Sequence, residues 1–150
     1  MSVLKTLLAG VCCAALCFAC SDSSTASGTS GTSSSAFPAS PLATVTSAGG
    51  ALTIEIRTRP AQPPSRGTCE AEYRVLDAVS GEPVDGLSLE VVPWMVSMGH
   101  GSSGKPTIAA QGDGRYVVSK LSLYMAGRWE LRTTFSGSRA DSAAPAIDVE

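Results

Sequence analysis

The sequence predicts an all-β domain, a single immunoglobulin-like antiparallel β-sandwich of about seven strands, in the C-terminal part of the chain. Three observations favour this fold. Apolar and polar residues alternate with the period of two that is typical of half-buried strands, turn-forming residues recur at intervals of about ten residues, and no segment has a convincing helical period. The Cys pair of antibody domains is missing, which indicates a different branch of this architecture.

The first three expected strands lie at residues 52–57, 70–75 and 87–91. In each of them an apolar side chain occupies every second position, and Thr, Glu, Arg or Ser fills the positions between. The segment Ser80-Gly81-Glu82-Pro83, followed by Asp85-Gly86, predicts the turn between the second and the third strand. Arg57 and its polar neighbours are expected on the solvent face.

The remaining expected strands lie at residues 107–110, 116–118, 129–135 and 147–149. The first of these has the weakest alternation, and the second follows the turn Gly112-Asp113-Gly114. Trp94 and Trp129 are expected to be core aromatics, because large aromatic side chains contribute most to the cores of small domains.

An apolar leader precedes the domain. Residues 1–19 carry a single charge, Lys5, and end in the small residue Ala19, which is the layout of a secretory signal. The run Leu16-Cys17-Phe18-Ala19-Cys20 resembles the lipobox of bacterial lipoproteins, although position −3 is Cys17 where Leu is usual. The resemblance implies that Cys20 is acylated and begins the mature protein. The alternative is ordinary secretion with cleavage after Ala19.

The expected organisation is a lipoprotein signal peptide at 1–19, a disordered tether rich in Ser, Thr, Gly and Ala at 20–48, and the β-sandwich at 49–150. No segment is apolar enough over about 20 residues to span a bilayer. The chain is therefore expected in the cell envelope, extracytoplasmic and held to the membrane by lipid. Ser21 favours the outer membrane in cells that sort lipoproteins by this position.

Charge and cysteine content exclude two classes of protein. The chain has 11 Lys and Arg against 13 Asp and Glu, without clusters, so neither a nucleic-acid footprint nor a polybasic membrane patch is present. Three of the five Cys would leave with the leader and Cys20 would be acylated, so a disulfide framework is excluded. Cys69 is expected to be a small buried hydrophobe, with pairing between chains or metal binding as the alternatives.

The unusual chemistry lies in Pro93-Trp94-Met95-Val96-Ser97-Met98-Gly99-His100-Gly101, which contains the only His of the chain. If the strand stays extended past Pro93, Met98 and His100 lie on the same side. Thioether sulfur and imidazole nitrogen suit copper, above all Cu(I). Met95 is the nearest third ligand, and Met125 belongs to another loop at the same end. The alternative is that Met fills gaps in the core and that the Met-Gly-His corner is a packed turn.

The segment from Arg66 to Ser103, with the motifs Pro93-Trp94-Met95 and Met98-Gly99-His100-Gly101, resembles the YtkA-like domain, which is related to FixH-type proteins. Gly114-Arg115-Tyr116 and Met125-Ala126-Gly127-Arg128-Trp129 extend the resemblance over nearly the whole domain. It implies a small extracytoplasmic β-sandwich, and several relatives are linked to copper handling or to the assembly of copper-containing oxidases. The Met-x-x-Met-x-His run of that family corresponds to Met95, Met98 and His100.

Two functions remain open from the sequence. One is a copper-binding or copper-handling accessory module, and the other is a non-metal interaction or structural module that contacts a protein of the envelope. An enzyme is not expected. A Ser–His–Asp arrangement of His100 and Asp113 lacks the strained nucleophile turn, and no phosphate loop or dinucleotide fingerprint is present.

Overall fold

Ten strands build residues 36–150, the part of the chain that the computed structural model describes. The strands are β1 (Ala43–Thr46), β2 (Leu52–Arg59), β3 (Gly67–Asp77), β4 (Leu87–Met95), β5 (His100–Gly101), β6 (Thr107–Gly112), β7 (Arg115–Leu123), β8 (Gly127–Gly137), β9 (Asp141–Ala143) and β10 (Ala146–Val149). Within this range there is no helix long and apolar enough to cross a bilayer. The leader and Cys20 lie outside the described residues.

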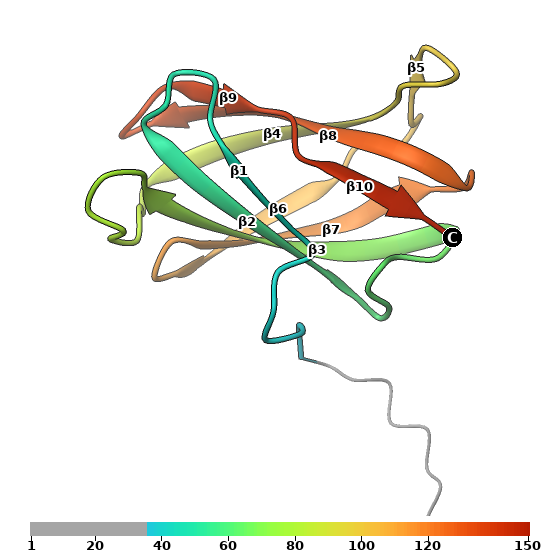
Figure 1. Cartoon of the computed structure of the whole chain (residues 1–150), viewed down its shortest axis with the longest axis horizontal. Helices are drawn as coiled ribbons and strands as arrows, with labels where there is room; N and C mark the ends of the chain where they lie inside the picture. Colours follow the sequence, from blue (N-terminus) through green and yellow to red (C-terminus); the bar gives the residue numbers. More distant parts are fainter. Residues whose placement is uncertain (1–35) are drawn as a thin grey trace, which may run out of the picture. The chain divides into compact units, whose positions relative to one another are not determined.

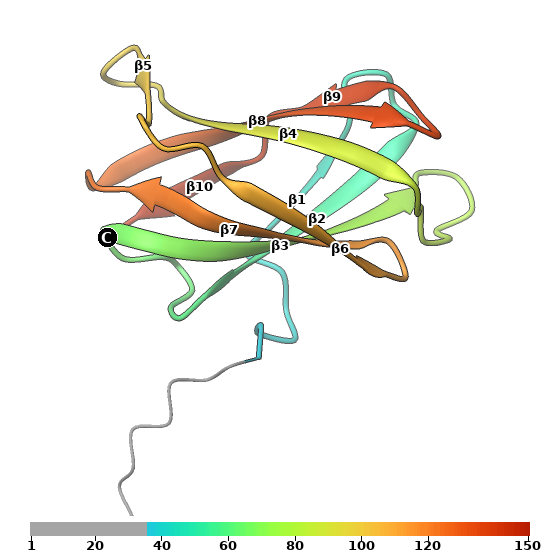
Figure 2. The same ribbon diagram turned by 180° about the vertical axis from the view of Figure 1, so that it is seen from behind.

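The strands form two antiparallel sheets that pack face to face (Figures 1 and 2). One sheet has the order β1-β2-β3-β7-β6. The other has the order β10-β8-β4-β5, and β9 also pairs with β8. The expected all-β sandwich is confirmed.

All seven expected strands are present, as β2, β3, β4, β6, β7, β8 and β10. The three strands β1, β5 and β9 were not expected. β5 and β9 have two and three residues, too few to display an alternation, and β1 has the sequence Ala-Thr-Val-Thr, whose small and polar residues resemble those of the expected tether. β1 lies inside the range expected to be a tether, and Ala43 pairs with Ile56 of β2. The expected boundary between residues 48 and 49 is therefore too late, since the sheet begins at residue 43.

The core lies between the two sheets and contains the inward-facing residues of every long strand. In β3, for example, Ala71, Tyr73 and Val75 are fully buried, while the residues between them are more exposed. Trp129 of β8 is 2% exposed, which confirms its expected place in the core. Burying an apolar side chain of this kind contributes about 1.5–3 kcal/mol, so the core supplies most of the driving force for folding.

Trp94 is not in the core, contrary to expectation. It is only partly buried and belongs to the outward-facing set of β4, whose inward-facing neighbours are Pro93 and Met95. The guanidinium of Arg132, on the adjacent strand β8, stacks over the Trp94 ring at 4.4 Å from the centroid. A tryptophan on an outer face is shielded here by an arginine, and a pattern of apolar residues does not distinguish this arrangement from burial.

Arg57 also departs from its expected solvent position. It is 7% exposed, because the segment before β1 lies over this part of the sheet. The Nε of Arg57 donates a hydrogen bond to the carbonyl oxygen of Ala39 at 3.3 Å. Nearby, the guanidinium of Arg59 stacks over the Phe37 ring at 4.4 Å. Residues 37–39 are thus part of the folded unit and are held to the outer face of the sheet.

The turn that follows β3 is organised by Asp77. Its Oδ1 accepts hydrogen bonds from the backbone N–H groups of Val79 and Ser80, each at 2.9 Å. Its Oδ2 pairs with Nη1 of Arg139 at 2.6 Å. These donors, the backbone N–H groups first, hold the pKa of the Asp77 carboxyl well below its usual range. The Asp77 carboxylate therefore stays ionised at physiological pH and stabilises the turn.

Candidate functional site

The β4–β5 hairpin carries most of the candidate ligands, and a turn positions them. β4 ends at Met95, and the Met95 carbonyl oxygen accepts hydrogen bonds from the N–H groups of Met98 at 3.3 Å and Gly99 at 3.0 Å. Gly99 has φ 67°, in the left-handed region that glycine adopts without strain. The chain reverses there, and His100 of β5 lies directly opposite Met95. The hairpin stands out at one end of the sandwich (Figures 1 and 2).

This reversal changes the relation between Met98 and His100. The strand stays extended only as far as Met95, so Met98 lies in the turn and the two-residue spacing does not place it beside His100. Met98 is 54% exposed and His100 is also exposed, whereas Met95 is 4% exposed and belongs to the core. The terminal methyl of Met95 lies near Gly127, where an added Cβ would be 3.2 Å from it.

His100 and Met125 line the same pocket, which has a volume of about 290 Å³. The other lining residues are Gly101, Ser102, Ser103, Ser122, Tyr124 and Trp129. Met98 and Met95 are not among them. The structure thus places His100 of the β4–β5 hairpin and Met125 of the β7–β8 loop, which connects the two sheets, around one pocket. Met125 is 38% exposed at this position.

Two hydrogen bonds fix the loop that carries Met125. The indole Nε1 of Trp129 donates to the carbonyl oxygen of Met125 at 2.9 Å. The hydroxyls of Tyr124 and Thr68 lie 3.1 Å apart and share a hydrogen bond. Trp129 therefore serves the pocket in two ways, as its apolar wall and as the anchor of the loop. The sequence contained no signal for these supporting roles, which depend on the pairing of distant strands.

The His100 ring has one nitrogen engaged by the backbone. Its Nδ1 lies 3.2 Å from the Gly101 carbonyl oxygen. When Nδ1 carries the proton it donates to this oxygen, and the Nε2 lone pair is then free for a metal ion. Among residues 36–150, no group of three or more His, Cys, Asp or Glu residues is placed to hold a metal ion. The pocket lining offers one residue with a thioether sulfur and one with an imidazole nitrogen, and these ligand types suit Cu(I) better than zinc or calcium.

Cys69 is a buried free thiol, as expected of a small hydrophobe. Burial, with a smaller contribution from the adjacent Glu70 carboxylate, raises the pKa of the Cys69 thiol to about 11. Metal binding requires the thiolate. Burial therefore disfavours the thiolate form of Cys69, and Cys69 is not among the residues that line the His100 pocket.

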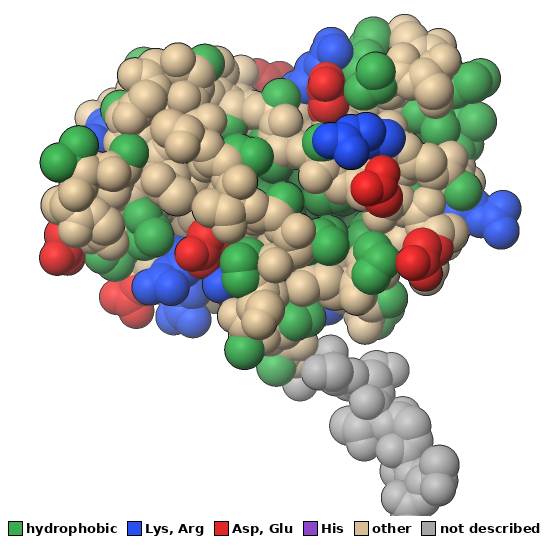
Figure 3. Space-filling model, viewed as in Figure 1, with side chains coloured by type: hydrophobic (Ala, Val, Ile, Leu, Met, Phe, Trp, Pro, Cys, Tyr) green, Lys and Arg blue, Asp and Glu red, His purple; other side chains and the backbone are tan. Residues whose placement is uncertain are grey.

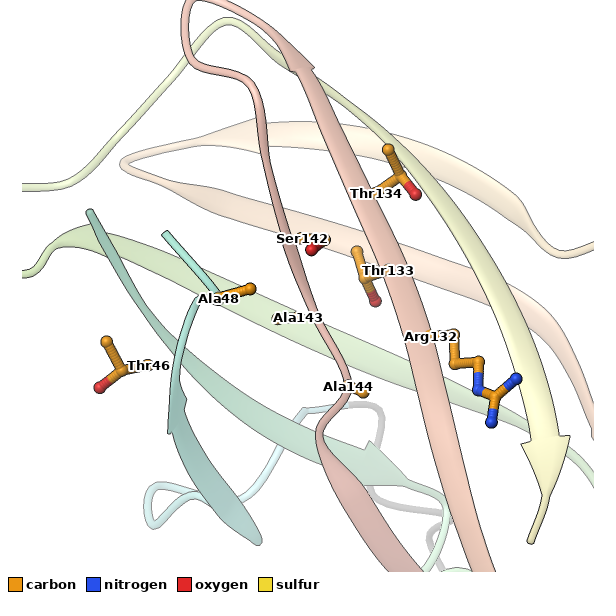
Figure 4. A pocket seen from close by; sticks show the side chains of 8 residues that line it. All are labelled: Thr46, Ala48, Arg132, Thr133, Thr134, Ser142, Ala143 and Ala144. Carbon is orange, nitrogen blue, oxygen red and sulfur yellow. The ribbon is translucent and has the colours of Figure 1, made fainter. Parts of the chain in front are cut away.

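Two further observations concern the residues that line the His100 pocket and the other hollows of the domain. The lining of the His100 pocket includes no carboxylate, and Asp113 lines a different hollow. A separate hollow of about 430 Å³ lies along β8 and β9 (Figure 4), where small residues dominate and Arg132 is the one charged side chain of its lining.

Comparison with known proteins gives one family match. A family model described as YtkA-like matches residues 48–134. Among solved structures, a copper-bound variant of FetP from uropathogenic Escherichia coli strain F11 is similar, with a TM-score of 0.45 and 8% identity. The alignment covers 73% of this chain and 94% of that chain. A likeness this weak carries no information about what this chain binds. No curated protein matches the chain.

Proposed function

The chain belongs to the YtkA-like family, and on that premise we propose that it is a lipid-anchored, extracytoplasmic module that binds Cu(I) with His100 and Met125. The observation that carries the proposal is the pocket that these two residues share, although one lies in the β4–β5 hairpin and the other in the loop between β7 and β8. Binding is the whole of the proposed activity. No catalytic step is assigned to the protein.

The chemistry of the pocket supports a soft, exchangeable ion. The Gly101 carbonyl orients the imidazole, and Trp129 holds the loop that presents the thioether. Tyr124 and Trp129 provide apolar walls that limit competition from water. Met98 is exposed on the turn before His100, so it is available as a further thioether at the rim. Met95, buried beneath the hairpin, supports the turn and would have to leave the core to bind an ion.

Replacing His100 by Ala together with Met125 by Leu should weaken Cu(I) binding by about 100-fold or more, because both ligands of the pocket are lost. Competition between the full-length chain and a Cu(I) chelator of known affinity would measure the change. Met125→Leu conserves volume, so the fold should be retained.

Met98→Leu is the matched control for this experiment. It removes an exposed thioether that lies outside the pocket lining, so it should change the affinity far less than the double substitution. If Met98→Leu alone abolishes binding, the ligands centre on the turn and the shared pocket is not the site. A wild-type chain that fails to compete with a weak Cu(I) chelator would remove the copper function altogether.

One observation favours the second function, a non-metal interaction module. The Met95 carbonyl closes the turn with two hydrogen bonds and the Met95 side chain is buried, which is the behaviour expected of a packed structural corner. In that case the exposed Val96, Met98 and Tyr124 would contact a protein of the envelope. The chelator competition separates the two functions, because the interaction module requires no metal affinity.

The anchor is proposed from the sequence alone, since residues 1–19 and Cys20 lie outside the described part. The apolar leader that ends in Ala19-Cys20 motivates it. Intact-mass measurement of protein extracted from membranes should give a chain that begins at acylated Cys20. A soluble chain without acyl groups would contradict the anchor but would leave the copper proposal untouched. Ser21 makes the outer membrane the proposed location in cells that sort by this residue.

A further inference from the structure

The outer face of the sheet formed by β1, β2, β3, β7 and β6 carries a ladder of charges. In one row, Glu55 of β2 lies opposite Arg74 of β3, and Arg74 in turn lies opposite Arg115 of β7. In the next row, Arg57 lies opposite Glu72. Opposite charges at facing positions attract each other, whereas facing arginines repel. The Arg74–Arg115 pair is therefore unfavourable unless a negative charge is added near it.

These side chains surround a hollow of about 500 Å³. Its lining consists of Arg57, Glu72, Arg74, Pro83, Asp113 and Arg115. Basic and acidic side chains gather at the lower left of Figure 3, over the tip of the β6–β7 hairpin. The lining has three guanidinium groups and two carboxylates, and Glu55, which pairs with Arg57 and lies 4.0 Å from Arg74, is the third carboxylate of the cluster. Guanidinium groups in a concave surface can attract anions when their own carboxylates are only weakly engaged.

The guanidinium groups of Arg74 and Arg115 have N–H donors that their ion pairs leave unused. Nη1 of Arg74 lies 4.0 Å from Glu55 Oε2, and Nη2 of Arg115 lies 3.6 Å from Asp113 Oδ2. Both separations exceed the range of about 2.7–3.2 Å for an N–H···O hydrogen bond. The two side chains are 45% and 46% exposed, so a ligand from solution can reach them.

Arg57 adds a buried charge to the same hollow. Its side chain is only 9% exposed, and its Nη2 is paired with Glu55 at 2.8 Å. Its Nη1 is buried and has no hydrogen-bond partner among the described residues, with Glu72 Oε1 at 3.8 Å. A buried cation with an unpaired donor is costly. A negative charge in the hollow would reduce this cost through its Coulomb attraction to Arg57.

We propose that this hollow binds a phosphate group between Arg74 and Arg115, with Arg57 adding charge at its inner side. The planar guanidinium fork matches the spacing of phosphate oxygens, and two facing forks can hold one such group from both sides. A dianionic phosphate also balances the repulsion between the two arginines better than a single carboxylate. The phosphate can come from solution or from a phospholipid headgroup, and both sources present the same oxygens.

The competing explanation is that the charged side chains on this face of the sheet are simply solvated by water and bind no ligand. Arg74 and Arg115 would then extend into water, and the weak contacts with Glu55 and Asp113 would contribute little, as exposed ion pairs usually do. This explanation predicts that phosphate acts on the protein only through ionic strength. The two explanations therefore differ in whether binding saturates and whether it depends on particular arginines.

Titration of the full-length chain with sodium phosphate, against sodium chloride at equal ionic strength, tests the site by calorimetry and by amide chemical shifts. Saturable binding should move the resonances of β3 and β7, and Arg74→Gln and Arg115→Gln should each weaken it about tenfold. Arg128→Gln is the matched control, because Arg128 is an exposed arginine of β8, in the other sheet. Thermal unfolding of each variant shows that the fold is retained.

Vesicles separate the two sources of phosphate. Binding to free phosphate that is lost in the Gln variants supports a soluble ligand. The vesicle measurements use the full-length chain with Cys20→Ser, so that the proposed acyl group does not itself bind the vesicles. Binding only to vesicles that contain phosphatidic acid, and not to phosphatidylcholine vesicles, supports a headgroup if the Gln variants also lose it. The proposal is overturned if neither probe binds saturably, or if Arg74→Gln and Arg115→Gln bind like Arg128→Gln. None of these outcomes depends on copper.

Discussion

Replacing Trp129 by Ala should lower the free energy of unfolding by about 3–5 kcal/mol, the range for removing a large aromatic side chain from a core. Trp129 is 2% exposed and lies opposite Met95 in the β4–β8 pairing. The substitution leaves a cavity and also removes the hydrogen bond to the Met125 carbonyl. Urea unfolding of the full-length chain, followed by circular dichroism, measures the loss.

Trp94→Ala is the matched control for Trp129→Ala. Trp94 is only partly buried on the outer face, and its main identified contact is the stacked guanidinium of Arg132. Its loss should cost less, on the order of 1 kcal/mol. Similar losses for the two variants would mean that the core assignment of Trp129 is wrong. Trp129→Phe should fall between them, because it keeps most of the apolar volume but not the N–H donor.

Gly114→Ala should destabilise the domain by about 2–5 kcal/mol, because strain and a steric clash add together. Gly114 has φ 66°, which a residue with a Cβ adopts at a cost. A Cβ built there would also lie 2.4 Å from the Val75 carbonyl oxygen and 3.0 Å from the Val84 nitrogen. Both are backbone atoms, so neither can move away without disturbing the sheet. Urea unfolding monitored by tryptophan fluorescence measures the effect.

Gly112, in the same turn, provides the control. Its φ is 77°, but no atom lies within 4 Å of a Cβ added there. Gly112→Ala should therefore show the strain alone, about 1–2 kcal/mol. Equal losses for the two glycines would contradict the close approach of Val75 and Val84 to Gly114.

Alternation of apolar residues was sufficient to predict the fold class and the seven longer strands, because a half-buried strand must show this pattern wherever it lies. The pattern fails for short strands such as β5, which has two residues and is defined only by its pairing with β4. The pattern also fails where segments that are distant in the sequence determine whether a side chain is buried. The burial of Arg57 depends on Ala39, and the outward position of Trp94 depends on the register of β4.

The candidate site shows the same limit. The ligand types, and the candidates His100 and Met125, were evident from the sequence. Their joint place in one pocket was not, because it depends on the β4–β5 hairpin and the β7–β8 loop lying at the same end of the sandwich. The condition for placing Met98 and His100 on one side, an extended strand, holds only as far as Met95. Gly99 turns the chain, and a period of two applies only while the backbone stays extended.

The order of strands in the two sheets bears on how quickly the chain can fold. The two central pairings, β3 with β7 and β4 with β8, each join strands separated by three other strands in the sequence. Such non-local pairings close large loops before any contact compensates their entropy, so domains of this topology fold in milliseconds to seconds and not in microseconds. During that interval the edges of both sheets are unprotected. Until the strands have paired, these exposed edges can pair with other chains, so the slow topology prolongs the period in which the chain is prone to aggregate.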